Sequence, residues 1–436
     1  MTQPRSIRFV VLLTILLLPV VAFAQSSNGS ISGSVTDDSG AAIPGVTVTA
    51  TNLATGATRS AQSNTTGYFQ IALLPPGAYG VTGELDGFRA VKLDSVIVNV
   101  GSDVSLSLKM QVGVAETVTV TAAAPLIEVE RTQVSSVVNE AAIQNLPANG
   151  RNFIDFVLTT PGVVKDVRAG DISFAGQRGT LNSLVIDGAN NDNTFFGQSL
   201  GRTGSGRAPY QFSQDAVKEF QVNANAYSAE YGRAGGAVIN VVTKSGTNEF
   251  HGAGFYFLRD KKYNANDYIN VINNRAKSPY HFDQYGASGG GPIVRDKHFF
   301  FVNFDAQRNE TPNPIILGSG RSIVIHNPDD QRGLDLLTPF ANDYTRNQNQ
   351  DVYLLKTDHE LFSNAHLSLR YNRQKFTGVN FENGSSINAV EHTGDSLVQT
   401  DTLSGVFSTT TGSSFFNEVR AQWAKDSEPG KANTNA

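Results

Sequence analysis

The chain has 436 residues, enough for roughly two to four domains, and carries 34 basic and 39 acidic side chains. This mildly acidic balance argues against a nucleic-acid partner, because nucleic acids bind to basic surfaces. The sequence has no cysteine, which excludes disulfide bonds, so the fold must be stabilised by core burial or by sheet closure.

Residues 1–24 have the features of a secretory signal peptide. Two arginines precede the apolar run Phe9–Ala24, which ends with small residues in the positions that signal peptidase requires. We therefore predict cleavage between Ala24 and Gln25, which removes two positive charges and changes the formal net charge from −5 to −7. A retained membrane anchor is the alternative, but the run is short for a spanning helix and Pro19 interrupts it.

Residues 29–111 consist of short apolar-polar alternations separated by Gly, Pro and Asp. In "GVTVTA", for example, Val46, Val48 and Ala50 alternate with polar residues. Strands at this regular spacing, with turn residues between them, predict a small antiparallel β-sandwich.

The segment 116–122, "ETVTVTA", has the period-two pattern of a strand with one apolar face. No hairpin partner lies nearby, because "AAAP" comes directly after it and "VSLSLKM" already supplies a final strand for the sandwich. The segment consists of Glu116, Thr117, Val118, Thr119, Val120, Thr121 and Ala122.

Residues 125–245 predict a mixed α+β domain rich in glycine and asparagine. The stretch Ala141–Val164 contains short helical pieces broken by two prolines. Leu184–Ile186 and "AVINVVT" predict buried strands, and we expect a short helix over Asp215–Phe220.

Residues 246–436 predict strands of about ten residues that alternate between an apolar and a polar face. The apolar faces include Val302, Phe304, Leu367, Leu369, Tyr371, Val419, Ala421 and Trp423, and the polar faces include Asn303, Asp305, Gln307, His366, Ser368, Arg370, Asn372, Glu418, Arg420 and Gln422. This pattern fits the first strands of an antiparallel transmembrane β-barrel, and a soluble half-exposed sheet gives the same alternation. The signal peptide and the many aromatic residues favour the membrane interpretation.

The sequence offers no catalytic constellation, so we do not expect an enzyme. "GQSLG" (Gly197–Gly201) matches the pattern of a nucleophile elbow, but a loop rich in asparagine precedes it and no helix comes after it. No histidine motif predicts a metal site.

The stretch "DGANNDN" (Asp187–Asn193) crowds oxygen ligands but lacks the spacing and the closing glutamate of a calcium loop. Such residues are typical of Asx turns in an exposed loop. The family resemblance given below also implies a candidate ligand loop here, with Asp187, Asn190, Asn191, Asp192 and Asn193 as the candidate residues.

Two stretches in residues 29–111 closely resemble the carboxypeptidase regulatory-like domain, a transthyretin-like β-sandwich that is not itself catalytic. They are "GSVTDDSGAAIPGVTVTATN" and "NTTGYFQIALLPPGAYGVTGELDGF". The matching residues are Asp37, Gly40, Pro44, Gly45, Gly67, Phe69, Pro76, Gly77, Tyr79, Gly87 and Phe88.

The part of the chain after this sandwich resembles the plug of a TonB-dependent outer-membrane receptor of the Oar-like group. The resemblance rests on "LPANGRNF", "LTTPGV", "LVIDGANNDN", "EFQVNANAYSAEYGRAGGAVINVVTKSGTNEFHG" and "FDQYGASGGGPIVRDKHFFFVNFD". It extends to about Asp305, and more loosely beyond. In this family the plug lies inside a barrel of about 22 strands, and the receptor imports a nutrient with energy from the inner-membrane TonB complex.

The resemblance implies that segment 116–122 is a TonB box, which binds the periplasmic domain of TonB by strand addition. A last strand of the sandwich, or a linker, is the alternative. The resemblance also implies that the sandwich is periplasmic and that the barrel contacts outer-membrane lipid. The substrate would be an unidentified small molecule, glycan or peptide, and no cofactor is implied.

Two features depart from the family pattern. About seven barrel strands can be counted after Ser245, and the chain ends at Ala436 instead of an aromatic residue. An open barrel edge leaves backbone groups unpaired in lipid, so we expect an N-terminal fragment that does not form a working channel alone. The competing hypotheses are a secreted or surface β-rich adhesion protein and an accessory module of a hydrolase.

Overall fold

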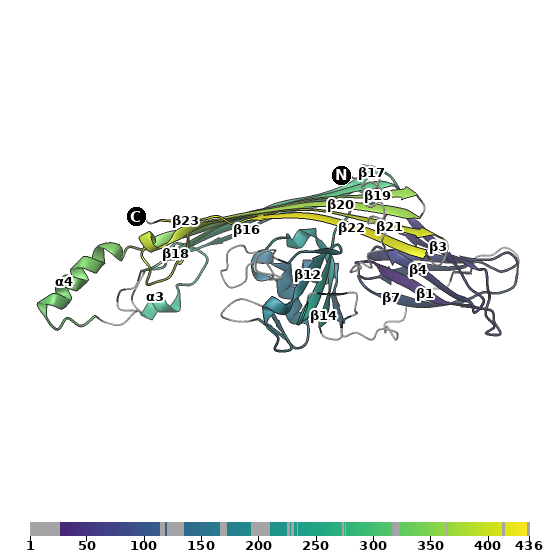
Figure 1. Cartoon of the computed structure of the whole chain (residues 1–436), viewed down its shortest axis with the longest axis horizontal. Helices are drawn as coiled ribbons and strands as arrows, with labels where there is room; N and C mark the ends of the chain where they lie inside the picture. Colours follow the sequence, from purple (N-terminus) through teal and green to yellow (C-terminus); the bar gives the residue numbers. More distant parts are fainter. Residues whose placement is uncertain are drawn as a thin grey trace, which may run out of the picture.

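A computed structural model of the chain contains a β-sandwich, a small α+β unit and a long antiparallel sheet, in this order along the sequence (Figure 1). The structure describes residues 27–113, 118–119, 135–165, 172–192, 210–224, 227, 231–232, 234–272, 274, 276–315, 317, 323–362, 364–411 and 415–433. The predicted signal peptide with Ala24 and Gln25 lies outside these residues, as do Glu116, Thr117, Val120, Thr121, Ala122 and Asn193.

The sandwich consists of two sheets with the strand orders β4-β1-β7 and β3-β2-β5-β6-β8. Its strands are β1 (Gly29–Thr36), β2 (Thr47–Asn52), β3 (Thr58–Gln62), β4 (Tyr68–Leu74), β5 (Gly77–Glu84), β6 (Val91–Val98), β7 (Asp103–Lys109) and β8 (Val118–Thr119). Alternate residues of each sheet point inward, and Val46, Val48 and Ala50 are fully buried. The sequence-based prediction of a β-sandwich is confirmed, although β1 and β7 run parallel.

The α+β unit formed by the described residues from 135 to 243, called the plug unit after the resemblance seen in the sequence, has a five-stranded sheet of order β13-β12-β15-β14-β9. Its elements are β9 (Ser135–Val138), α2 (Glu140–Asn145), η1 (Asn149–Arg151), η2 (Phe153–Thr159), β10 (Val163–Lys165), β11 (Ile172–Phe174), η3 (Gly179–Leu181), β12 (Ser183–Ile186), β13 (Ala189–Asn190), η4 (Gln214–Ala216), β14 (Val217–Ala224) and β15 (Ala237–Thr243). The broken helical pieces and the two buried strands agree with the sequence-based expectation. The helix expected over Asp215–Phe220 is wrong, because η4 ends at Ala216 and β14 begins at the next residue.

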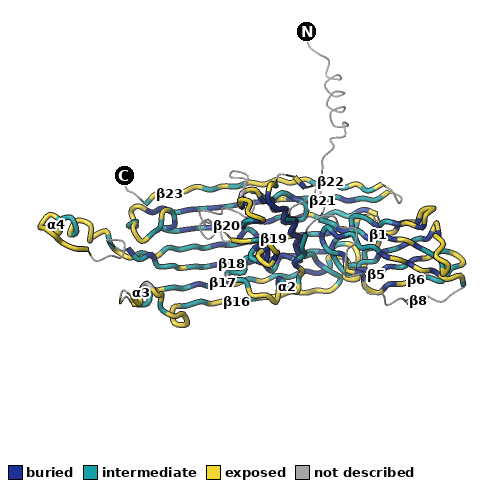
Figure 2. Tube along the Cα trace, turned by 90° about the horizontal axis from the view of Figure 1, so that it is seen from below, coloured by how far each residue is buried: buried dark blue, intermediate teal, exposed yellow. Residues whose placement is uncertain are grey.

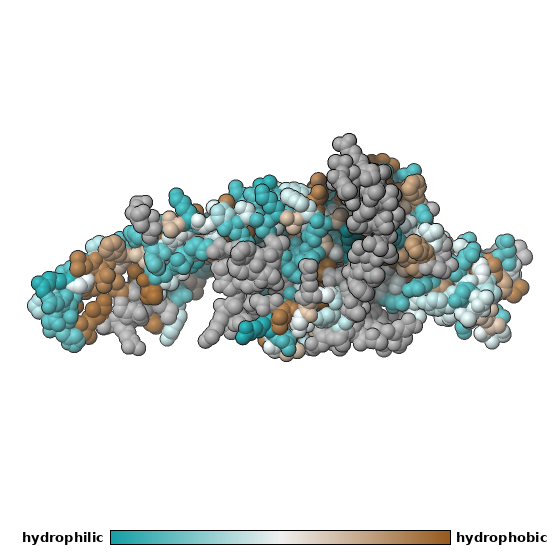
Figure 3. Space-filling view, in the orientation of Figure 1, coloured by the Kyte–Doolittle hydropathy of each residue, from teal (hydrophilic) through white to brown (hydrophobic). Residues whose placement is uncertain are grey.

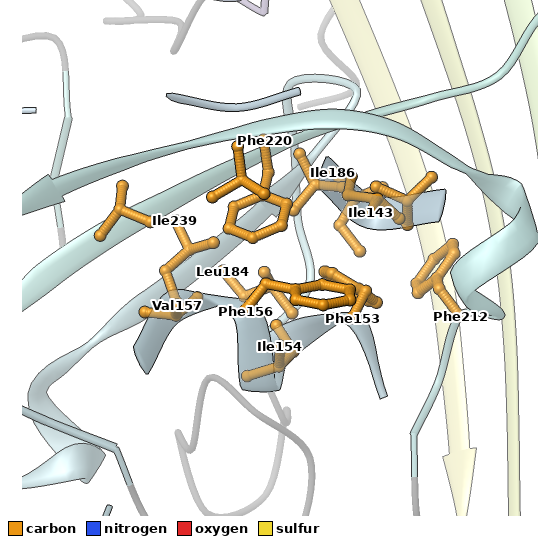
Figure 4. Packing of buried hydrophobic residues seen from close by; sticks show 14 of the residues in the cluster. Ile143, Phe153, Ile154, Phe156, Val157, Leu184, Ile186, Phe212, Phe220 and Ile239 are labelled. Carbon is orange, nitrogen blue, oxygen red and sulfur yellow. The ribbon is translucent and has the colours of Figure 1, made fainter. Parts of the chain in front are cut away.

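The core of the plug unit forms where η2 packs on the sheet (Figure 4). Phe153 and Phe220 meet edge to face with ring centroids 5.9 Å apart. The same buried cluster includes Phe301 and Leu354, which belong to the long sheet. The plug unit therefore shares its core with the sheet that covers it.

The barrel sheet is antiparallel and follows chain order from β16 to β22, and β23 pairs with β21. Its strands are β16 (His251–Asp260), β17 (His281–Val294), β18 (His298–Asn313), β19 (Tyr344–Phe362), β20 (Ala365–Glu382), β21 (Gly394–Thr411), β22 (Phe415–Ser427) and β23 (Gly430–Ala432). In Figure 1 this sheet arches over the plug unit and does not close into a barrel. The helices α3 (Tyr268–Ile272), α4 (Pro328–Leu337), η6 (Thr338–Phe340) and η7 (Val390–His392) lie in the described parts of its longer connections.

The predicted alternation along the barrel strands is confirmed (Figure 2). On β20, Leu369 is 41% exposed and points outward, whereas its neighbour Arg370 is 2% exposed and points toward the plug unit. On β22, Trp423 is 54% exposed. At these positions the outer face is apolar and the inner face polar, as in outer-membrane barrels, whereas Phe301 and Leu354 are inward apolar residues that pack on the plug unit.

The two ends of the barrel sheet differ in their connections. At the end near the sandwich, β17–β18, β19–β20 and β21–β22 are joined by two or three residues, whereas β18 and β19 are joined at the other end by a connection that contains α4. Apolar residues gather around α4 in Figure 3, including Leu336, Leu337 and Phe340. The sandwich therefore lies at the end of the sheet with the short connections. Among the described residues, no helix is long and apolar enough to cross a bilayer.

Candidate functional site

Asp187, the first residue of the candidate ligand loop, lies at the end of the plug sheet. Strands β12 and β15 are parallel neighbours, so Asp187 after β12 comes close to Thr243 at the end of β15. Its carboxylate accepts hydrogen bonds from the Thr243 backbone N–H (2.8 Å) and hydroxyl (2.7 Å). Its φ of 48° is in the left-handed region, which Asp tolerates better than most residues because its side chain bonds locally.

Two cations of the barrel wall reach the same carboxylate. Arg370 Nη1 of β20 is 2.8 Å from one oxygen, and Lys356 Nζ of β19 is 3.6 Å from the other. The side chains of both cations are almost fully buried, with exposures of 2% and 6%. Burial by itself raises the pKa of Asp187, but the two cations and the bonds from Thr243 outweigh it and hold that pKa below its usual value. This cluster is a charged contact between plug unit and wall.

The other described residues of the loop bind mainly to the plug unit itself. The Asp192 carboxylate accepts from the Leu184 N–H at 2.8 Å and from the Asn190 amide at 2.9 Å, while the Asn191 amide donates to the Gln211 side chain. No group of three or more potential metal-ligating carboxylates, histidines or cysteines occurs in the part of the chain that the structure describes. A role of this loop in ligand binding stays a prediction.

A second contact between plug unit and wall centres on Asp305 of β18, which is fully buried. Tyr210 and Ser213 of the plug unit each donate a hydrogen bond of 2.7 Å to its carboxylate. The Gln350 amide donates to the Tyr210 carbonyl at 2.6 Å. The sequence placed Asp305 on the polar face of its strand, but it gave no sign of these partners.

A third contact between plug unit and wall involves β16, in which residues 255–258 are all apolar. Arg151 of the plug unit lies 4.2 Å from the ring centre of Phe255 and 5.1 Å from that of Phe257. Its guanidinium also forms an ion pair of 2.7 Å with Asp215. These two aromatics on β16 therefore form part of a cation–π contact with the plug unit, so both faces of the strand carry large apolar side chains.

The predicted TonB-box segment lies mostly outside the described residues. Its two described residues, Val118 and Thr119, form β8, which pairs in parallel with Val91 and Lys92 of β6. Strand β8 is the last strand of its sheet. The expected final strand of the sandwich, β7, belongs to the other sheet, where it pairs with β1. The assignment as a TonB box stays a prediction.

Comparisons with known proteins define the class of this chain. Residues 30–111 match the model of the carboxypeptidase regulatory-like domain, and residues 242–319 match the model of an outer membrane beta barrel domain. The chain is therefore an outer-membrane protein with an N-terminal regulatory-like sandwich, and its predicted fold class and location are confirmed.

A sequence match to one characterised protein indicates a more specific class of outer-membrane protein. The chain is 27% identical over 304 residues to the TonB-dependent transporter Oar of Myxococcus xanthus, a match that covers 66% of this chain and 27% of Oar. The predicted resemblance to Oar-like TonB-dependent receptors is thus confirmed. Proteins of this kind are transporters and receptors, which are not enzymes.

The fold also resembles solved structures at low sequence identity. The outer membrane transporter YddB from Escherichia coli matches 68% of this chain and 39% of its own, with 14% identity and a TM-score of 0.50. A ferric enterobactin receptor from Pseudomonas aeruginosa matches 67% of this chain and 41% of its own, with 14% identity and a TM-score of 0.48. The chain thus spans less than half the length of each of these relatives.

Proposed function

We propose that this chain is part of a TonB-dependent transporter that takes up a nutrient across the outer membrane. The proposed layout is a signal peptide (1–24), a periplasmic sandwich (29–111), a TonB box (116–122), a plug (125–245) and the first barrel strands (246–436). The similarity to Oar and the outer membrane beta barrel match support this function. The substrate is an unidentified small molecule, glycan or peptide that enters from the end with the long loops.

The observation that carries the proposal is the charged attachment of the plug unit to the inner face of the barrel sheet. Asp187 of the plug unit is bound to Arg370 and Lys356 of the wall in a nearly dry environment. Removal of one partner from a buried ion pair of this kind costs about 3–5 kcal/mol. A plug held in this way needs an external energy source to move, and a TonB-type partner supplies one by pulling.

Segment 116–122 is the proposed point of pulling. An extended segment adds to the edge of a partner sheet through main-chain hydrogen bonds, each worth about 0.5–1.5 kcal/mol net. Val118 and Val120 alternate with threonines and would set the register. The segment precedes β9, the first strand of the plug sheet, so a pull on it acts directly on the plug.

Replacement of Val118 by proline tests this role. Proline removes a backbone donor and prevents strand addition, so Val118→Pro should abolish binding to the periplasmic domain of TonB in a pull-down. Val129→Pro, the same exchange a few residues after the predicted box, is the control and should bind normally. The sandwich should stay folded in both variants, because β8 is a two-residue strand at the edge of its sheet. Equal binding of Val118→Pro and the parent protein would refute the box assignment.

Cell fractionation separates this proposal from a secreted or surface adhesion protein. The proposal requires recovery with the outer membrane. Recovery of the protein in the soluble secreted fraction would contradict it and would favour the adhesion hypothesis.

A further inference from the structure

The barrel-facing end of the sandwich is attached to both other parts of the molecule. Arg59 of β3 forms an ion pair of 2.9 Å with Glu360 of β19, and their side chains are 10% and 14% exposed. The Asn248 N–H, between plug unit and β16, donates to the Ala54 carbonyl at 2.9 Å. Asn28 donates to Glu418 of β22 at 2.8 Å. The sandwich is therefore held at the periplasmic end of the barrel sheet.

Strand β14 of the plug unit also holds the sandwich through two consecutive residues. The Lys218 ammonium donates to the Pro76 carbonyl in the β4–β5 turn, and the Glu219 carboxylate accepts from the Val100 N–H in the β6–β7 turn. Glu219 is 6% exposed, so this bond is shielded from water. Two turns of the sandwich are thus attached to one plug strand.

The strand that holds the sandwich is the direct neighbour of the first plug strand. Residues 220–223 of β14 pair with residues 135–138 of β9, which comes after the linker from segment 116–122. If β9 is displaced, β14 loses one of its two neighbours in the sheet. The contacts of Lys218 and Glu219 with the sandwich depend on the position of β14.

The contact between the three parts is polar and incompletely packed. A cavity of about 670 Å³ lies between them, lined by residues of the sandwich, the plug unit and the barrel strands. Its lining carries charges of both signs, among them Arg59, Lys218, Lys356, Asp358 and Glu360. Interfaces that separate resemble this one, whereas permanent interfaces are packed and apolar.

We propose that the sandwich is a releasable lid over the periplasmic end of the plug, fastened by Arg59–Glu360 and by β14. The inference rests on the proposed transport function, because a lid in this place has to move before a substrate can leave. Displacement of β9 shifts β14, breaks the bonds of Lys218 and Glu219, and leaves Arg59–Glu360 as the principal ion pair between sandwich and wall. The sandwich then swings away from the barrel sheet.

Distance measurements between spin labels test the lid. The chain has no cysteine, so Asp86→Cys at the far tip of the sandwich and Thr411→Cys at the end of β21 provide two unique exposed labelling sites. In outer-membrane preparations without TonB we expect one narrow distance distribution. Arg59→Glu should add a second, longer and broader distribution, with a rise in the open-to-closed ratio of roughly tenfold.

Two further variants make this result specific. Lys109→Glu makes the same charge change on an exposed residue at the opposite end of the sandwich and should leave the narrow distribution unchanged. Glu360→Gln removes the partner on the wall without any change in the sandwich, so it should reproduce the effect of Arg59→Glu even if that variant folds poorly. An unchanged narrow distribution in both Arg59→Glu and Glu360→Gln would overturn the lid.

A second experiment tests the coupling to TonB. Addition of the periplasmic TonB domain should populate the longer distance in the parent protein and not in Val118→Pro. TonB binding without a change in distance overturns the coupling and leaves the proposed transport function intact. Absence of TonB binding contradicts the proposed function, whereas the measurements without TonB still report on the fastening of the lid.

Discussion

The charged contact at Asp187 gives the sharpest prediction. We expect Asp187→Asn to weaken the attachment of the plug unit to the barrel wall while the backbone keeps its conformation. Asn has the shape of Asp and, like Asp, tolerates the left-handed φ of 48° found here. The substitution therefore removes one negative charge and also turns one accepting oxygen into a donating NH2 group, so that one of the two bonds from Thr243 is lost.

The size of the effect depends on the two cations that lose their partner. At an effective dielectric constant of about 20, charges separated by 2.8 Å and 3.6 Å attract each other by about 6 and about 5 kcal/mol. Desolvation of the three groups offsets much of this attraction. Removal of one partner nevertheless leaves Arg370 and Lys356 buried without the carboxylate that pairs with them, and such losses amount to about 3–5 kcal/mol. We expect a decrease of that size in the stability of the plug attachment.

Hydrogen exchange of the backbone amides in β12 and β15 measures this quantity, because it reports the free energy of local opening. Asp155→Asn is the matched control in the same unit, where the ion pair with Lys165 is partly exposed and worth less than about 1 kcal/mol. The double variant Asp187→Asn, Arg370→Gln should lose less than the sum of the two single losses. If Asp187→Asn and Asp155→Asn shift the opening free energy equally, the reasoning is wrong.

Two more predictions concern pH and close packing. The folded-state pKa of Asp187 lies below its usual value of 3.8. The contribution of Asp187 to plug attachment is therefore present above pH 3.8 and is lost as the pH falls through the lower folded-state pKa. Hydrogen exchange at stepped pH should show this loss in the parent protein and not in Asp187→Asn. A Cβ on Gly33 would lie 1.9 Å from the Leu106 carbonyl oxygen. Gly33→Ala should therefore force β1 and β7 apart and destabilise the sandwich by about 1–3 kcal/mol, as measured by thermal unfolding. Gly80→Ala is the control and should cost far less, because the nearest atom to its Cβ would be 3.5 Å away.

The strands of the barrel were predictable because their alternation is a local property. Leu369 and Arg370 point to opposite sides as neighbours in any strand do, and one side faces water or lipid while the other faces the plug unit. The helix expected over Asp215–Phe220 failed for the opposite reason. Its apolar positions fit a helical period, but β14 is buried on both faces, so apolar residues no longer mark a single side.

The contacts between the parts could not be predicted because they join residues far apart in sequence. Asp187 was selected as a loop residue with oxygen ligands, yet its partners lie on β19 and β20. The pairing of β8 with β6 could not be predicted either, because parallel strands are not joined by a tight turn that could be recognised in the sequence. The alternation in sequence placed Arg370 and Asp305 on the polar face of their strands. This position was the only indication that charged side chains on the inner face of the sheet would require partners.

The presence of Phe301 and Leu354 in the core of the plug unit has a consequence for biogenesis. Until β18 and β19 are in place, the plug unit exposes the apolar surface that these two side chains cover. During transit through the periplasm this surface would attract other unfolded chains or a holding chaperone. We expect the plug to reach its final packing only during insertion of the strands into the membrane, so assembly of the wall and maturation of the plug are one event.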